Sequence, residues 1–160
     1  MDNASSDRSL EIARQFPSVH MIVLEKNTGF ACGNNLAIEA ASSELEWFAL
    51  INPDAFAEPR WLEELLIAAE SSPEFDVFGS KLVNAADPTL LDGTGDACHI
   101  SGLVWRTAHG VPVLTLSDSE CEIFFPCAAA ALYRRSALLE VGGFDEDLFA
   151  MWKMSISVFD

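Results

Sequence analysis

Apolar residues in the first half of the chain fall into short continuous runs separated by longer, helix-like segments. Continuous apolar runs are typical of strands buried on both faces, whereas apolar residues that recur every three or four positions are typical of helices. The pattern predicts helices at 7–16, 30–41 and 59–71 and strands at 19–24, 47–51 and 75–83. Because helices and apolar strands alternate, we expect an α/β layer with a parallel sheet.

The second half of the chain has a less regular pattern, in which glycines and polar residues interrupt the apolar runs. It predicts a loop at 92–96, a hairpin of strands at 100–105 and 111–116, a strand at 124–133 and a helix at 135–141. Two glycines, Gly142 and Gly143, are expected to end that helix.

The composition indicates a folded domain and excludes several classes of partner. Half of the 160 residues are apolar and the mean hydropathy is +0.21, which is enough for a core and rules out wholesale disorder. Asp and Glu total 25 against 9 Lys and Arg, so a net charge of −16 repels nucleic-acid phosphates and anionic lipid. The longest apolar stretch, 123–133, is far shorter than the roughly 20 residues of a transmembrane segment.

The cysteines and histidines give no sign of a disulfide framework or of a zinc site. None of the four cysteines has C-x-x-C spacing, and the three histidines lack ligand spacing with them or with one another. We therefore expect reduced thiols in a cytoplasmic protein.

A polar turn follows the predicted strand 47–51 and is a candidate metal site. Asn52 and Asp54 offer an amide and a carboxylate oxygen, which are hard ligands suited to Mg²⁺ or Mn²⁺. Such an ion would bridge the diphosphate of a nucleotide substrate and offset the acidity of the chain. The alternative is a capped turn in which Asp54 accepts hydrogen bonds from local backbone amides.

Two further polar segments have both a functional and a purely structural interpretation. The first residues are rich in hydrogen-bonding side chains, and their carboxylates are able to hold a base or ribose; the alternative is a helix cap beside a frayed terminus. The candidate nucleotide-binding residues there are Asp2, Asn3, Ser5 and Asp7. The segment from Asp92 to Asp96 is either a metal loop or a plain turn, and it lacks the further ligands of a calcium loop.

Several short motifs, in this order and at this spacing, together resemble the inverting, nucleotide-sugar glycosyltransferases of family 2, especially rhamnosyltransferase-like bacterial members. The resemblance extends over nearly the whole chain. Its markers are DNASSDRS at 2–9, NTGFACGNN at 27–35, LINPD at 50–54, PRWL at 59–62, Pro126-Cys127 followed by YRR at 133–135, and VGGFDE at 141–146.

This resemblance implies a GT-A fold, a Rossmann-like mixed sheet with flanking helices that is incomplete in this chain. It makes Asp2 a nucleotide-contacting acid at the end of a strand, and it puts Asn52 and Asp54 in the place of the family's D-x-D metal motif. The acceptor side would be formed by Gly142, Gly143, Phe144, Asp145 and Glu146. Arg8 stands where the family usually has glycine.

The resemblance also implies the reaction and its partners. The donor would be a nucleotide-activated sugar, with dTDP-rhamnose as the first expectation, and the acceptor a cell-surface glycan or its lipid-linked precursor. A carboxylate base would deprotonate the acceptor hydroxyl, while Mg²⁺ or Mn²⁺ stabilises the leaving diphosphate. We expect a cytoplasmic protein, peripheral to the inner membrane, that binds no nucleic acid.

Both ends of the chain depart from the family pattern. The family has a strand–helix–strand unit before the DNASSD motif, so we expect exposed strand edges and self-association through them. When residues 151–160 are translated back into their possible codons and read in a frame shifted by one base, those codons permit the family's Tyr-Val-Glu-Asp segment, which bears the catalytic base. The expectation is a partial catalytic domain at 1–150, an out-of-frame tail at 151–160, and no catalytic base or sugar transfer. The rival hypotheses are a non-catalytic remnant that binds a nucleotide or a partner, and a poorly folded pseudogene product.

Overall fold

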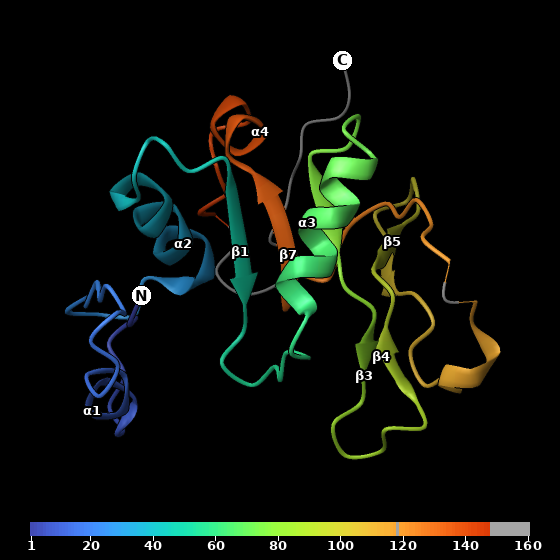
Figure 1. The fold of residues 1–160 in the computed structure, drawn as a ribbon, viewed down its shortest axis with the longest axis horizontal. Helices are drawn as coiled ribbons and strands as arrows, with labels where there is room; N and C mark the ends of the chain where they lie inside the picture. Colours follow the sequence, from blue (N-terminus) through green and yellow to red (C-terminus); the bar gives the residue numbers. More distant parts are fainter. Residues whose placement is uncertain (118, 148–160) are drawn as a thin grey trace. The chain divides into compact units, whose positions relative to one another are not determined.

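The computed structural model describes residues 1–117 and 119–147, so the predicted tail at 151–160 and the base segment after Ala150 lie outside the described residues. The chain divides into two compact units, which are described separately here. One contains residues 1–46 and the chain from 136 onward, and the other contains residues 47–135. Figure 1 shows the elements of both units.

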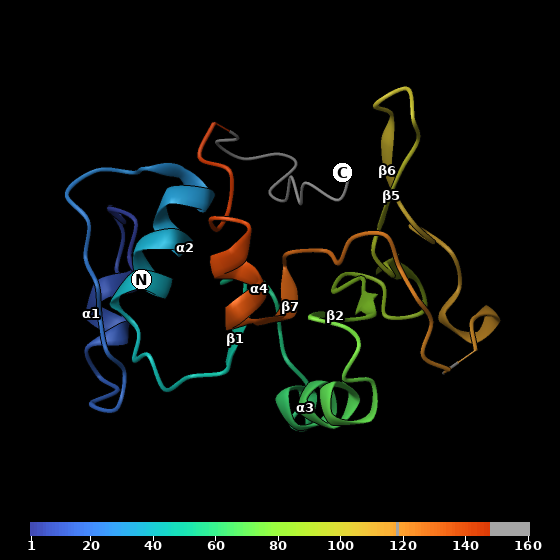
Figure 2. The same ribbon diagram turned by 90° about the horizontal axis from the view of Figure 1, so that it is seen from above.

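The core of the second unit is a three-stranded sheet covered by one helix. The strand order is β1 (Trp47–Ile51), β7 (Ala130–Arg134) and β2 (Val77–Gly79), with both pairings antiparallel. Helix α3 (Trp61–Ser71) lies along one face of this sheet (Figures 1 and 2). The packed side chains between them are Leu65, Ala69 and Leu132, with Trp47, Trp61 and Phe78 around them.

The central position of β7 follows from its composition. Its first four residues, Ala-Ala-Leu-Tyr, are all buried and carry no charge, as expected for a strand with neighbours on both sides. Arg134 ends the strand at the edge of the core, where its guanidinium pairs with Asp76 at 2.7 Å and lies 4.3 Å from the centre of the Trp47 ring. Trp61, the first residue of α3, donates its indole N–H to Ser80 Oγ at 2.8 Å, and this bond fixes the start of the helix.

Beyond β2 the chain forms two small antiparallel ladders. Strand β3 (Leu82–Val83) pairs with β4 (Leu91–Gly93), and β5 (Asp96–Cys98) pairs with β6 (Val104–Arg106). A short 3-10 helix, η1 (Val113–Thr115), follows β6.

The first unit is built around α2 (Gly29–Ala40). It also contains α1 (Ser9–Ala13) and most of α4 (Arg135–Glu140), which directly follows β7. Asp2 forms an isolated parallel bridge with Val23. Among the described residues, no helix is long and apolar enough to cross a membrane.

The α/β class expected from the sequence is confirmed, but the expected parallel sheet is wrong. Every strand ladder in the described part of the chain is antiparallel, and the one parallel pairing there is the Asp2–Val23 bridge. An apolar run indicates that both faces of a strand are buried, and it carries no information on the direction of the neighbouring strand.

Several predicted boundaries also change. Residues 19–24 pair only through that bridge, 75–83 divides into β2 and β3, and 124–133 shortens to β7. The predicted loop at 92–96 ends β4 and begins β5, and the hairpin is β5–β6 rather than 100–105 with 111–116. The helix expected at 7–16 is the short α1.

Candidate functional site

The first candidate residue, Asp2, is held by its backbone. Its N–H donates to the Ile22 carbonyl at 2.7 Å, and its carbonyl accepts from the Leu24 N–H at 3.0 Å. One carboxylate oxygen, Oδ2, accepts from the Ser5 N–H at 3.1 Å, and this closes a turn in which Ala4 has a φ of +62°. The segment is therefore a fixed turn at a strand bridge, not the frayed terminus that the structural alternative assumed.

Asn3 joins this segment to the start of α2. Its Oδ1 accepts from the Thr28 N–H at 2.8 Å and lies 3.2 Å from Thr28 Oγ1, and its Nδ2 donates to the Gly29 carbonyl at 2.9 Å. Both halves of the amide are thus used within the protein. Asn3 positions the neighbouring Asp2, and its own contact with a nucleotide stays a prediction.

We expect Asn3→Ala to destabilise the first unit by about 2 kcal/mol, because it leaves partly buried backbone groups of Thr28 and Gly29 without partners. Amide hydrogen exchange at the Thr28 N–H measures the effect directly. Ser5→Ala is the control, since Ser5 is exposed and contributes only its backbone N–H to this turn. Equal protection of Thr28 in wild type and Asn3→Ala would contradict the assignment.

Asp7 follows the structural alternative. Its Oδ1 accepts from the Ser9 N–H at 2.9 Å, at the first residue of α1. Hydrogen bonds from the side chain and backbone of Ser9 lower the pKa of Asp7 below its ordinary value. The carboxylate therefore closes an exposed Asx turn directly before α1, and a nucleotide contact by Asp7 stays a prediction.

The acceptor-side residues are held by Asn35 of α2, which the sequence analysis includes only in the NTGFACGNN marker and not among the candidate site residues. Asn35 Nδ2 donates to the Phe144 carbonyl at 2.9 Å and to Glu146 Oε1 at 3.0 Å, and its Oδ1 accepts from the Phe144 N–H at 2.9 Å. Phe144 is almost fully buried, and its ring meets the edge of Phe30 at a centroid distance of 5.6 Å. The Gly142–Glu146 segment is thus anchored to α2 at both backbone and side chain.

Gly142 and Gly143 follow α4 and end it, as the sequence predicts. Gly142 and Gly143 both have positive φ, at +81° and +85°. The Gly143 N–H returns to the Leu138 carbonyl at 2.7 Å, which satisfies a carbonyl of the last helical turn. Asp145 and Glu146 remain exposed at the surface of this turn.

The candidate metal residues lie in the second unit, immediately after β1. The Asn52 N–H donates to the Ala129 carbonyl at 2.8 Å, and the Asn52 carbonyl accepts from the Ala55 N–H at 3.0 Å, so the turn is held by its backbone. Asp54 is exposed, and no hydrogen bond reaches its carboxylate from the described residues. The capped turn proposed as the alternative for Asp54 is therefore not formed by its side chain. Residues 1–117 and 119–147 contain no cluster of three or more His, Cys, Asp or Glu able to hold a metal.

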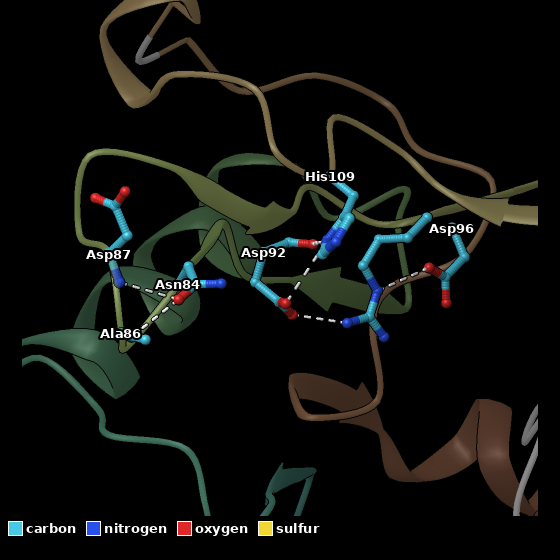
Figure 3. Close-up of polar contacts among 7 residues, drawn as sticks. Asn84, Ala86, Asp87, Asp92, Asp96 and His109 are labelled. Carbon is cyan, nitrogen blue, oxygen red and sulfur yellow. Dashed lines mark hydrogen bonds and ion pairs between the residues drawn. The ribbon is translucent and has the colours of Figure 1, made fainter.

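The segment from Asp92 to Asp96, the other possible metal loop, instead takes part in an ion-pair network (Figure 3). Arg106 Nη1 lies 2.7 Å from Asp92 Oδ2, and its Nε lies 3.5 Å from Asp96 Oδ1. His109 Nδ1 is 2.8 Å from the Asp92 carbonyl oxygen. Partial burial lowers the pKa of Arg106, but the interactions of its guanidinium with Cys127, Asp92 and Asp96 outweigh this effect and raise the pKa. The positive charge between the carboxylates of Asp92 and Asp96 is therefore the guanidinium of Arg106, in the place where the metal-loop hypothesis would put an ion.

Asn84 closes the neighbouring turn in the same view (Figure 3). Its Oδ1 accepts from the backbone N–H groups of Ala86 and Asp87 at 2.9 and 3.1 Å. This is an Asx turn that connects β3 to β4, and it uses the Asn84 side chain for structure.

The structure thus brings the sequence-predicted residues together in two groups. Asp2 and Asn3 meet the start of α2, and Phe144 and Glu146 meet Asn35 in the same helix, all within the first unit. Asn52 and Asp54 belong to the second unit. The segment 27–35, which entered the sequence analysis only as a family marker, supports the whole first group through Thr28, Gly29 and Asn35.

One of the three comparisons with known proteins found a match. A model of the family described as "Glycosyl transferase family 2" matches residues 1–142, a range that includes Asp2, Asn3, Asn52 and Asp54 and ends before Phe144 and Glu146. The searches of curated proteins and of solved structures found no match. The mixed α/β architecture is consistent with part of a GT-A fold, as the resemblance implied. Because the family model matches far more than half of the chain, this protein belongs to glycosyl transferase family 2.

Proposed function

We propose that this family 2 domain binds a nucleotide-diphosphate sugar, with dTDP-rhamnose as the donor, and serves sugar transfer with inversion to a cell-surface glycan or lipid-linked acceptor. The observation that carries the proposal is the Asn3 amide, which joins the DNASSD segment to the start of α2. Through the neighbouring backbone it fixes Asp2, whose second carboxylate oxygen, Oδ1, accepts no hydrogen bond from the described residues. That oxygen is open to accept from a ribose hydroxyl or a base N–H.

The residues after β1 fit a divalent cation that is held jointly with substrate. Mg²⁺ commonly takes one or two protein oxygens and completes its shell with water and substrate phosphates. Asp54 supplies an exposed carboxylate without an internal partner among the described residues, and Asn52 supplies a half-buried amide. When bound, such an ion would neutralise charge on the leaving diphosphate.

The acceptor would lie beside the segment that Asn35 anchors. Phe144 is fixed through both its N–H and its carbonyl, and Glu146 accepts from the same amide. Fixed backbone with exposed carboxylates suits recognition of sugar hydroxyls, which are hydrogen-bond donors. We assign the catalytic base to no described residue, and we expect this chain to bind donor without transferring sugar. We place the protein in the cytoplasm, peripheral to the inner membrane.

Calorimetry with dTDP and UDP in the presence of Mn²⁺ tests the proposal. Asp2→Asn is expected to weaken binding at least about tenfold, because one hydrogen bond to a charged group is worth roughly 1.5–3 kcal/mol. Asp54→Asn is expected to abolish the dependence of affinity on Mn²⁺. Asp87→Asn is the matched control, since this exposed carboxylate belongs to the turn after β3 and not to the proposed site. The absence of nucleotide binding by the wild-type chain would refute the proposal, and donor hydrolysis would refute the expected inactivity.

A role in association with a partner chain is the second candidate, and the observation that favours it is the edge of β1. Within the described residues β1 pairs only with β7, it carries no charged side chain, and Ala49 at its centre is exposed. An uncharged, unpaired strand edge is a template for strand addition by a second copy.

A further inference from the structure

The β5–β6 hairpin carries its apolar side chains outward. Ile100, at the turn, is fully exposed, and the exposed fractions of Leu103 and Trp105 are 65% and 49%. Trp105 lies at the centre of β6, and Leu103 directly precedes the first residue of that strand. In Figure 2 the hairpin extends away from α3 and the three-stranded sheet of its own unit. Large apolar side chains gathered at an exposed tip indicate contact with something apolar.

The charge pattern of this segment differs from that of the rest of the chain. The protein carries 25 acidic residues, yet positions 97–117 contain none. The charged residues of the hairpin are at its base, where Arg106 pairs with Asp96 of β5 and with Asp92 of β4. The absence of acidic residues at these positions lowers the local repulsion that the net charge of −16 causes at a lipid surface.

The order of residues along the hairpin matches the depth profile of a membrane interface. The aliphatic Ile100 and Leu103 come first, the amphipathic indole of Trp105 second, and the ion-paired Arg106 last. Leu103 directly precedes β6 and Arg106 ends it, so at a rise of about 3.3 Å per residue the two are separated by at most about 10 Å along the chain. Interfacial segments bury their apolar side chains about 5–10 Å deep, with tryptophan at the level of the headgroups.

The turn also provides internal partners for three of its backbone N–H groups, which lowers the cost of entering a less polar medium. The His99 N–H donates to the Leu103 carbonyl at 2.7 Å, and the Gly102 N–H donates to the His99 carbonyl at 2.8 Å. The Ser101 N–H is directed to His99 Nδ1 at 3.2 Å. These bonds leave the side chain of Ile100 as the most projecting group of the tip.

We propose that the tip of the β5–β6 hairpin, formed by Ile100, Leu103 and Trp105, inserts into the interfacial region of a lipid bilayer. This inference goes beyond sugar transfer, and it holds or fails independently of nucleotide binding. No helix among the described residues is able to cross a membrane, and insertion of this tip would bring the protein to an acceptor that is carried on lipid.

Flotation of the full chain with phosphatidylcholine vesicles tests the inference, since zwitterionic lipid does not repel the acidic protein. The double variant Ile100→Asp/Leu103→Asp is expected to lower the vesicle-bound to free ratio at least about tenfold, because it replaces two inserted aliphatic groups by charges. Leu114→Asp is the matched control: Leu114 is 98% exposed and lies in η1, outside the hairpin, so its binding should equal that of wild type.

Three outcomes would overturn the inference: no flotation of the wild-type chain, equal flotation of the double variant, or an equal loss in Leu114→Asp. Sedimentation velocity without lipid distinguishes a protein partner. If the double variant abolishes self-association of the wild-type chain while vesicle binding is unchanged, the tip is an interface between copies and not a lipid contact. Circular dichroism of all variants should be the same, since these side chains are exposed.

Discussion

Replacing Leu132 with alanine is expected to lower the free energy of unfolding of the second unit by about 3 kcal/mol, within the range of roughly 2–5 kcal/mol for buried Leu→Ala changes. Leu132 is 1% exposed and occupies the middle of β7. It is directly opposite Ala49 of β1 on one side and Phe78 of β2 on the other. Its side chain packs with Leu65 and Ala69 of α3, so the cavity left by alanine would be enclosed by helix and sheet together.

Urea denaturation followed by tryptophan fluorescence measures this loss, because Trp47 and Trp61 border the same core. Leu114→Ala is the matched control within the same unit: the chemical change is identical, but Leu114 is 98% exposed. The control should shift the free energy of unfolding by no more than about 0.5 kcal/mol. Similar values for the two variants would mean that the packing of α3 on β7 does not hold the unit together.

The elements that the sequence located well are those whose signal is local. Residues 47–51 form β1 as predicted, and α3 begins at Trp61, two positions after the proline that marked its first turn. The pairing of β1 with β7 joins segments about 80 residues apart, and their apolar patterns suit either direction. The antiparallel sheet therefore could not be derived from those patterns.

The candidate site shows the same division between local and distant information. The motifs at 2–9, 27–35 and 141–146 served only as markers of the family resemblance, and the structure joins these segments through Asn3 and Asn35. These hydrogen bonds cross 26 and 109 positions in the sequence, so no local rule could reveal that the two asparagines hold the segments. The sequence predicts only a loop at Asp92 and Asp96, because their ion-pair partner, Arg106, lies at least 10 positions away along the chain.

The two glycines after α4 give the sharpest test of that junction, because they share a backbone conformation and differ in surroundings. Both have φ near +80°, where a side chain costs about 1–2 kcal/mol. A Cβ on Gly142 would meet nothing within 4 Å, whereas a Cβ on Gly143 would approach Asn35 Oδ1 to 2.6 Å. Gly142→Ala is therefore expected to incur the backbone cost alone.

Gly143→Ala is expected to add about 1–2 kcal/mol to that cost, because the new methyl group displaces the Asn35 amide from the Phe144 N–H and carbonyl. Amide exchange at the Phe144 N–H should accelerate more in Gly143→Ala than in Gly142→Ala, by about five- to thirtyfold, a ratio that cancels the shared backbone strain. Asn35→Ala should reproduce the acceleration without strain, and combining it with Gly143→Ala should add little beyond the backbone cost. Equal exchange in the two glycine variants would mean that Asn35 does not hold the proposed acceptor segment, and the assignment of 142–146 to a fixed wall of the site would fall with it.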